Sequence, residues 1–241
     1  MTPAEKLIRT AEAELGYLEK KSNKSLDDKT ANAGGGNYTK YNRDLRAWAK
    51  VGSLNAQWCQ AFVDWCFITA FGLEGAKALL YTFTNYTPTG SSAFKRRGRY
   101  IRRGAGLPQP GDVVYFYSAS KGRIGHVGIV CKVGASQVTT IEGNAGNSVK
   151  KKRYALTNTY IDGYGSVDYS ALPEEPGGQT VRVTGGSVWV REGPAPDAAP
   201  LGVAHLGDAL PYLGKTCENG WHQVEFKGRA GWISGKYGRL Q

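Results

Sequence analysis

The feature that most constrains the fold is a change of pattern at residues 172–178, where the sequence reads LPEEPGG. Proline, glycine and glutamate in succession are typical of a linker between domains. Before this stretch, helical spacing of apolar residues gives way to strand-like segments, and after it short strand-like segments alternate with turns. We therefore expect an α+β domain over residues 1–170, a linker at 171–179 and a small all-β barrel over 180–241.

The first domain opens with helix signals. Residues 2–5 read TPAE, which fits the N-cap, first-turn proline and capping box of a helix that would end near Gly16. The segment WCQAFVDWCFITA, residues 58–70, places apolar side chains at helical spacing and predicts a buried central helix. A second helical stretch follows over about 73–81. Residues 20–45 are polar and glycine-rich and predict a long surface loop.

Strand signals come later in this domain. Three candidates follow the turn PQPG: Asp112–Tyr117, His126–Val133 and Gln137–Asn144. Helices that precede a set of neighbouring strands predict an α+β arrangement, with the helices packed on an antiparallel sheet.

The register of the last two strands decides which side chains meet. If residues 134–136 form a three-residue loop, the numbers of paired residues sum to 270. His126 then lies opposite Asn144, and Gly128 lies opposite Glu142. Because side chains alternate along a strand, His126, Glu142 and Asn144 share one face. A loop of two or four residues would shift the register by one residue, and these side chains would then no longer share a face.

Cys59 stands at the start of the predicted helix, with Ser53 or Asn55 as candidate caps. Backbone N–H groups and the positive dipole end of a helix stabilise a thiolate, so this position suits a nucleophile. The alternative is a buried core cysteine. Cys66 fits that alternative, because seven helical rises of about 1.5 Å place it roughly 10 Å from Cys59, too far for a disulfide. We expect all the cysteines to be free thiols.

Cys59 and the hairpin together form a candidate catalytic set. His126 would take the thiol proton, and Glu142 or Asn144 would orient the imidazole. The alternative for His126 is a core histidine with satisfied hydrogen bonds, which leaves the two polar neighbours without a role.

Four short motifs carry a resemblance: Trp58-Cys59, Pro110-Gly111-Asp112, Gly125-His126-Val127-Gly128 and Glu142-Gly143-Asn144. Together they resemble the CHAP domain of phage and bacterial peptidoglycan hydrolases, relatives of the NlpC/P60 and papain-like enzymes. The resemblance covers about residues 1–170 and implies a papain-like fold. It also implies Cys59 as nucleophile, His126 as general base, Glu142 as orienting residue and Asn144 as assisting residue.

Residues 14–20 (ELGYLEK) and 37–41 (NYTKY) resemble phage endolysins of Gram-positive hosts in particular. From this resemblance, Asn37, Tyr41 and Trp58 are candidate substrate-binding residues.

Metal ligands are few in this sequence. Two of its three histidines, His205 and His222, lie in the C-terminal segment, so we expect no zinc site in the first domain. Some CHAP proteins bind calcium through an Asp-rich N-terminal loop. Asp27-Asp28 lacks the alternating Asp spacing, so we expect a solvated loop and no cofactor, with calcium left open.

The C-terminal segment, residues 181–241, resembles a bacterial SH3-like wall-binding domain through motifs such as SVWVREGP and GWIS. Its tryptophans, Trp189, Trp221 and Trp232, are expected to pack inside the barrel, because small barrels fill their cores with aromatic rings.

The net charge of +11, from 31 Lys and Arg against 20 Asp and Glu, points to an anionic partner. A basic cluster at residues 95–103 lacks a nucleic-acid recognition motif, so we expect a solvated face or attraction to an anionic cell wall, and no nucleic acid. No run of about 18 apolar residues and no signal peptide are present, which predicts no stable membrane insertion. We expect synthesis in a host cytoplasm and action at the wall after holin-type release.

These observations favour an endolysin-type peptidoglycan hydrolase that cleaves an amide bond by Cys/His catalysis. The resemblance implies either an N-acetylmuramoyl-L-alanine amidase or a stem or cross-bridge endopeptidase, with a slight preference for the amidase. Two alternatives stay open: a non-catalytic wall-binding or phage structural protein, and a cytoplasmic cysteine protease.

Overall fold

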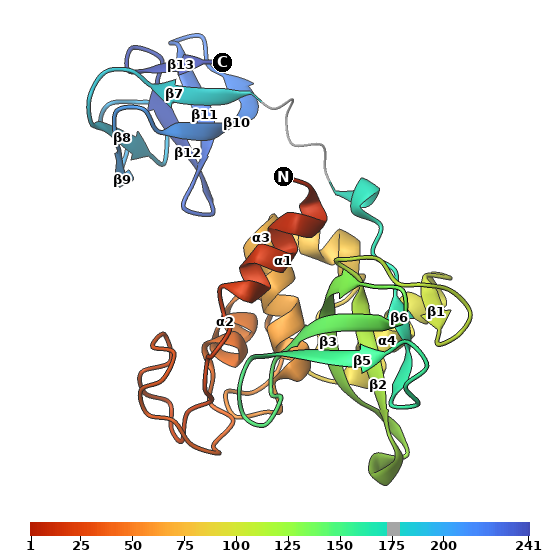
Figure 1. Cartoon of the computed structure of the whole chain (residues 1–241). Coiled ribbons are helices and arrows are strands. Elements are labelled where there is room, and N and C mark those ends of the chain that lie inside the picture. Colours follow the sequence, from red (N-terminus) through yellow and green to blue (C-terminus); the bar gives the residue numbers. More distant parts are fainter. Residues whose placement is uncertain (173–178) are drawn as a thin grey trace. The chain divides into compact units, whose positions relative to one another are not determined.

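The computed structural model describes residues 1–172 and 179–241, and the chain divides into two units, Met1–Leu172 and Pro173–Gln241 (Figure 1). The first unit contains helices and a sheet, and the described part of the second contains strands. The predicted combination of an α+β domain with an all-β domain is confirmed. The predicted linker at 171–179 falls mostly on residues 173–178, which lie outside the described residues.

Within residues 1–172, the helices are α1 (Pro3–Glu12), α2 (Lys40–Ala49), α3 (Cys59–Leu80) and α4 (Thr87–Arg96). The strands are β1 (Tyr100–Arg102), β2 (Val113–Ser118), β3 (Arg123–Val133), β4 (Gln137–Glu142), β5 (Lys150–Ala155) and β6 (Ile161–Gly165). Two short 3₁₀ helices complete this unit, η1 (Ala119–Lys121) and η2 (Tyr169–Ala171). The strands form an antiparallel sheet in the order β1-β6-β2-β3-β4-β5.

The predicted capping box of α1 is confirmed. The Thr2 hydroxyl accepts from the Glu5 backbone N–H at 3.2 Å, and the Glu5 carboxylate accepts from the Thr2 N–H at 2.8 Å. The helix ends at Glu12, before the predicted end, and Gly16 turns the chain with a φ of +83°. The predicted loop at 20–45 was wrong at its end, because α2 begins at Lys40.

The central helix α3 joins both predicted helical stretches across a kink at Gly72, where φ is +70°. Trp58 is its N-cap and makes no side-chain capping bond, so the predicted caps Ser53 and Asn55 were wrong. Almost every side of this helix is buried, because α1, α2 and α4 as well as the sheet pack around it.

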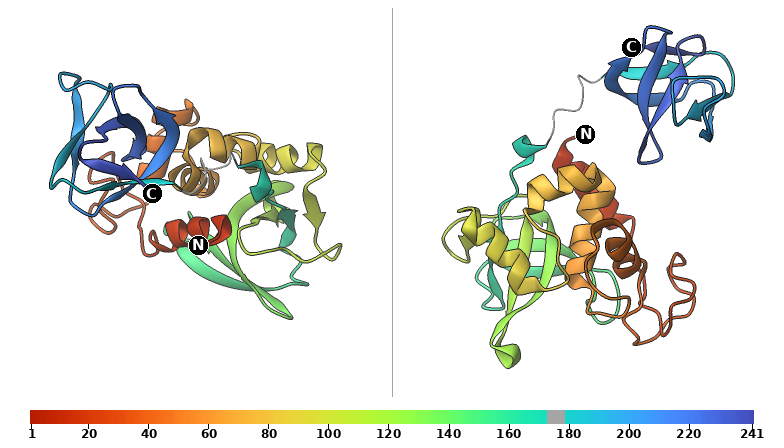
Figure 2. Two further views of the ribbon diagram at one scale, coloured as in Figure 1. Left: turned by 90° about the horizontal axis from the view of Figure 1, so that it is seen from above. Right: turned by 180° about the vertical axis from the view of Figure 1, so that it is seen from behind.

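The sheet has two faces with different neighbours. Apolar side chains such as Val113, Tyr115 and Ile129 belong to the core that α3 dominates, and Figures 1 and 2 show the long helix beside the sheet. Alternate residues, among them Val114 and Phe116, form a second, smaller cluster on the opposite face. The second face carries His126 and Glu142, whereas Cys59 belongs to the core on the helix side.

The second unit contains β7 (Thr180–Val183), β8 (Val188–Arg191), β9 (Pro200–Ala204), β10 (Ala209–Thr216), β11 (Trp221–Phe226), β12 (Arg229–Ser234) and β13 (Gly238–Leu240). Its strands follow the order β13-β7-β10-β11-β12-β8-β9. Trp221 and Trp232 are buried as predicted. The prediction for Trp189 was wrong: it is 50% exposed, because its strand neighbours Val188 and Val190 take the inward positions.

Neither unit offers a helix suited to crossing a bilayer, as far as the described residues go: none combines the required length with the required apolar character.

Candidate active site

Cys59 occupies the first position of α3 and is 4% exposed. The first-turn N–H groups of a helix have no acceptors within the helix, so the amide groups beside Cys59 are available to a negative charge. Cys66 lies two turns further along and is fully buried, and burial raises the pKa of its thiol well above the ordinary value. The helix therefore offers one cysteine at its polar end and keeps the other in an apolar core. All four cysteines are free thiols, as predicted.

The β3–β4 hairpin reaches the predicted register by a different route. Val133 pairs with Val138, so the numbers of paired residues sum to 271 beside the loop, and the predicted three-residue loop was wrong. The register then shifts by one residue at Cys131, which forms a bulge in β3. Beyond the bulge, Ile129 pairs with Ile141 and the predicted sum of 270 is restored.

Because of this compensation, His126 and Glu142 come together. His126 Nε2 lies 2.9 Å from Glu142 Oε2. The predicted strand pair between His126 and Asn144 was wrong, because β4 ends at Glu142 and Asn144 sits in a turn with a φ of +58°. Asn144 nevertheless lines the same cleft as the other two residues.

Glu142 is held by several donors. It is 1% exposed, and its carboxylate accepts from the Thr140 hydroxyl at 2.5 Å and from the Tyr154 hydroxyl at 3.3 Å, in addition to its contact with His126. A buried carboxylate needs such partners to offset its loss of hydration. Burial and the charge of Glu142 in turn raise the pKa of Tyr154, which keeps that hydroxyl a donor.

The electrostatics of His126 favour an imidazolium. Burial lowers its pKa, but hydrogen bonds to Cys59 and Glu142 outweigh burial and raise the pKa from 6.5 to about 10. Since Nε2 faces Glu142, Nδ1 is the nitrogen left for the Cys59 thiol. The ring also packs on Phe116, with centroids 5.6 Å apart. This arrangement can hold a thiolate and an imidazolium as a pair.

Two motif glycines explain how closely these groups approach. A Cβ added at Gly128 would lie 2.6 Å from Cγ of Glu142, and one added at Gly143 would lie 2.5 Å from Cβ of Phe62 in the first turn of α3. Any larger side chain would push the carboxylate or the strand end away from the helix that carries Cys59. The glycines thus set the distance between β4 and the candidate nucleophile.

A cleft of about 470 Å³ opens beside His126 and Glu142. Its lining includes His126, Glu142 and Asn144 together with Gln57, the residue before the cap of α3, and Tyr160 from the turn before β6. Thr140, Tyr154 and Gln57 are residues that sequence reasoning missed. Thr140 carried a signal, since it lies two positions before Glu142 and hence on the same face.

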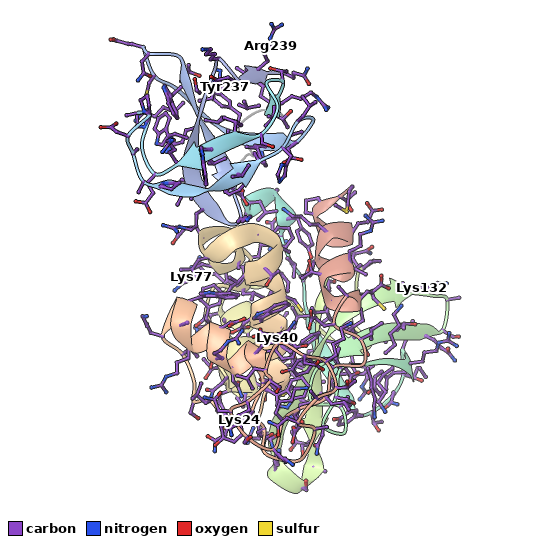
Figure 3. The ribbon with its side chains drawn as sticks, turned by 90° about the vertical axis from the view of Figure 1, so that its left-hand side faces the viewer. Lys24, Lys40, Lys77, Lys132, Tyr237 and Arg239 are labelled. Carbon is purple, nitrogen blue, oxygen red and sulfur yellow. The ribbon has the colours of Figure 1, made fainter. Side chains whose placement is uncertain are left out.

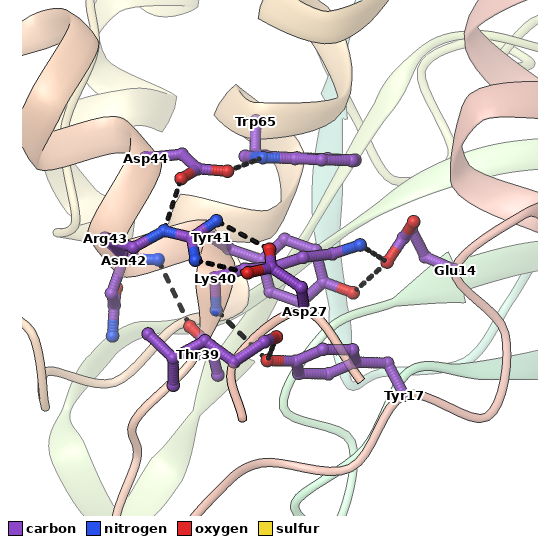
Figure 4. A network of polar contacts seen from close by, with 11 residues as sticks. Glu14, Tyr17, Asp27, Thr39, Lys40, Tyr41, Asn42, Arg43, Asp44 and Trp65 are labelled. Carbon is purple, nitrogen blue, oxygen red and sulfur yellow. Dashed lines mark hydrogen bonds and ion pairs between the residues drawn. The ribbon is translucent and has the colours of Figure 1, made fainter. Parts of the chain in front are cut away.

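The predicted substrate contacts are corrected for Tyr41 and Trp58, which are both fully buried. Tyr41 donates to Glu14 at 2.7 Å, as Figure 4 shows, and Trp58 donates to Glu19 at 2.8 Å. Their rings stack on each other with centroids 5.5 Å apart. These side chains support the start of α3 and do not line the cleft.

Asn37, the third candidate for substrate contact, is half-buried with a φ of +56°. Its backbone carbonyl accepts from Asn42 at 3.2 Å, and its N–H donates to Glu19 at 3.3 Å. Its role in substrate binding stays a prediction.

The N-terminal aspartates do not fit a calcium site. Asp27 is paired with both terminal nitrogens of Arg43 at 2.7 and 2.8 Å (Figure 4), and Asp28 accepts from the backbone N–H groups of Thr30 and Ala31. In residues 1–172 and 179–241, no three His, Cys, Asp or Glu side chains gather as metal ligands would.

Comparison with known families assigns both units. The family model of the CHAP domain matches residues 50–144, and that of the bacterial SH3 domain matches residues 186–239. The chain therefore contains a CHAP domain, followed by a bacterial SH3 domain. CHAP domains are amidase or peptidase hydrolases, and their combination with a bacterial SH3 domain suggests a peptidoglycan hydrolase. The CHAP match includes Cys59, His126 and Glu142, and the bacterial SH3 domain supports binding to the cell wall.

Two solved structures are similar in outline. They are described as "The crystal structure of Ly7917" and "The crystal structure of Ly7917 with the hydrolyzing product of MDP". Both align over 99% of this chain and 98% of theirs at 16% identity, with TM-scores of 0.43 and 0.41. No curated protein matches the chain.

Proposed function

We propose that this CHAP-domain protein is an endolysin-type hydrolase that cleaves an amide bond of peptidoglycan through Cys59, His126 and Glu142. The observation that carries the proposal is the 2.9 Å contact between His126 and the buried Glu142, next to a cysteine at a helix start. A nucleophile, a base and an orienting carboxylate in this order are what thiol catalysis requires.

In the reaction, Cys59 Sγ attacks the amide carbonyl and forms a C–S bond, while the first-turn N–H groups of α3 stabilise the oxyanion. The C–N bond then breaks, and the imidazolium of His126 gives its proton to the leaving amine. Water attacks the thioester next, His126 accepts a proton from that water, and the carboxylate product leaves with the thiolate regenerated. Glu142 keeps the imidazole oriented and favours its charged form throughout.

The bond that we propose as the target is the amide between muramic acid and L-alanine, with a peptide bond of the stem or cross-bridge as the alternative. The SH3 domain would hold the enzyme on the anionic wall of a Gram-positive host. The enzyme would be made in the host cytoplasm and reach the wall through a holin-type lesion. Asn144 would assist from the cleft, and the reaction as proposed needs no cofactor.

Mass spectrometry of products from purified peptidoglycan tests this proposal. An amidase releases intact stem peptides with free L-alanine amino termini and leaves the glycan strands uncut. An endopeptidase releases new termini within the stem or cross-bridge. Products cut only at glycosidic bonds would contradict the proposed amide chemistry.

A further inference from the structure

The cleft beside His126 carries positive charge that the reaction itself does not use. Lys121, Lys150 and Lys152 all line it and are exposed. The one carboxylate in the cleft lining is that of Glu142, whose oxygens already accept from His126, Thr140 and Tyr154. Among the ion pairs of the described chain, none involves any of the three lysines.

The sheet register aims two of these lysines at the site. Lys150 pairs across the strands with Glu142, and Lys152 pairs with Thr140, so both stand on the face that carries the catalytic carboxylate. Lys151, between them, points to the other face and forms an ion pair with Glu12 at 2.7 Å. In strand β5, Lys150 and Lys152 therefore line the cleft, whereas Lys151 forms an ion pair on the opposite face.

The third lysine comes from a different element. Lys121 closes η1 in the β2–β3 hairpin, and a Cβ added at Gly125 would lie 3.5 Å from its Cδ, so its stem runs alongside the residue before His126. Lys150 passes the turn that holds Asn144, since a Cβ at Gly146 would lie 3.5 Å from Lys150 Nζ. The cations thus border the cleft on two sides.

We propose that Lys121, Lys150 and Lys152 form a carboxylate-binding subsite that holds a free carboxylate of the stem peptide next to the scissile amide. This inference rests on the proposed function of the cleft. Stem peptides carry carboxyl groups that some walls leave free and others convert to carboxamides. An ammonium group binds a carboxylate through charge-assisted hydrogen bonds and gains much less from a neutral carboxamide. The subsite therefore selects acidic over amidated stems.

The test uses two soluble muropeptides that differ only in one carboxyl group, free in one and amidated in the other. Wild-type enzyme is expected to cleave the free acid with a kcat/KM about 10-fold higher. In Lys150→Gln/Lys152→Gln this ratio falls to near one, mainly through a higher KM for the acid. The matched control Lys151→Gln lies on the same strand but faces away from the cleft, and it keeps the wild-type ratio.

A wild-type ratio near one would overturn the subsite, as would a ratio that survives the double substitution in a variant with a native circular dichroism spectrum. A preference seen only on walls that bear phosphate polymers, and absent from the soluble pair, would also overturn it and would indicate attraction to phosphate instead.

Binding of the same muropeptides to Cys59→Ala separates this inference from the proposed function, because calorimetry reads the preference without turnover. If the wild-type enzyme does not cleave the muropeptides but Cys59→Ala still binds the free acid more tightly, only the catalytic proposal is contradicted. Cleavage without preference contradicts the subsite alone.

Discussion

The two units differ in what they bury. Of the described residues, fourteen polar or charged ones are buried, and all lie in the first unit, whereas the buried side chains of the second are apolar. A buried polar group destabilises a fold unless it is paired, and all of these side chains except Lys20 make a hydrogen bond; the Lys20 ammonium lies over the Tyr17 ring instead. Glu142 fixes His126, and Glu19 fixes Trp58 at the helix that carries Cys59.

The second unit has an apolar core and exposes a large aromatic side chain on its surface. Trp189 is 50% exposed, while Trp58 in the first unit is fully buried. The same residue type therefore supports a catalytic helix in one unit and is available to a ligand in the other. The first unit therefore depends on the geometry of its interior, and the second depends on its exposed surface.

The largest effect is expected for His126→Ala, which should lower kcat/KM on soluble wall fragments by about 10⁴-fold. Because thiol and imidazole act as one unit, the double variant with Cys59→Ala should be no worse than either single one. His205→Ala, in the second unit, is the matched control and should retain full activity on these fragments. A folded His126→Ala enzyme whose kcat/KM is within about 10-fold of the wild-type value would contradict a catalytic role for His126.

Glu142→Gln should be less severe, with a loss of roughly 10²-fold. The carboxylate favours the charged imidazolium, so its removal lowers the pKa of His126 from its raised value near 10. The alkaline limb of the pH profile, where activity falls as His126 loses its proton, should then move to lower pH by about one unit or more. Glu12→Gln, which removes a half-buried carboxylate that pairs with Lys151 and not with His126, should leave the profile in place. An unmoved alkaline limb in Glu142→Gln would rule out this role.

Separation of the units should have a moderate effect that depends on the substrate. Fragment 1–172 should match the full chain on soluble fragments and fall about 10-fold or more behind it on intact walls, because tethering raises the local concentration of the enzyme. Fragment 173–241 should sediment with walls and release nothing. Binding with no cleavage by either fragment or the full chain would favour a structural protein, and absence of wall binding would favour a cytoplasmic protease.

The smallest effect is expected for Trp189→Ala, which should weaken sedimentation of fragment 173–241 with walls by several fold. Its free energy of unfolding should change by less than about 0.5 kcal/mol, because an exposed ring is removed. Trp232→Ala, at a buried position of the same unit, should cost about 3 kcal/mol in denaturant unfolding. Equal unfolding costs for the two variants would contradict the division between core and surface.

Local patterns were enough to predict α3, the β2–β4 strands and the meeting of His126 with Glu142. Helical and strand periodicities are properties of a few consecutive residues, so sequence carries them directly. The predicted pairing beside the hairpin loop was wrong by one residue, and the bulge at Cys131 restores the predicted register near His126 and Glu142. A bulge has no comparable signal, because it depends on how neighbouring strands fit.

Strand β5 could not be predicted, since its sequence KKKRYA shows no alternation of apolar and polar residues. It is an edge strand, where charged side chains are typical. Tyr154, Lys150 and Lys152 were missed with it, although all three reach the cleft.

Long-range partners were equally inaccessible. The basic side chains at 95–103 are exposed, as expected, but two of their ion pairs were not predicted: Arg99 pairs with Asp168, and Lys95 lies 3.9 Å from Asp162, both distant in sequence. Other basic side chains, such as Lys24, Lys77 and Lys132, are exposed (Figure 3). Whether a charge is paired depends on the tertiary fold.

The most direct test of the central claim is release of new amino groups from purified peptidoglycan by wild type, Cys59→Ala and Cys217→Ala, measured at equal wall binding. Cys217 lies in the second unit and controls for loss of a thiol as such. Our account predicts that wild type and Cys217→Ala release amino groups at the same rate and that Cys59→Ala releases none above background. Release by folded Cys59→Ala at a rate within about 10-fold of wild type would contradict a Cys59 nucleophile.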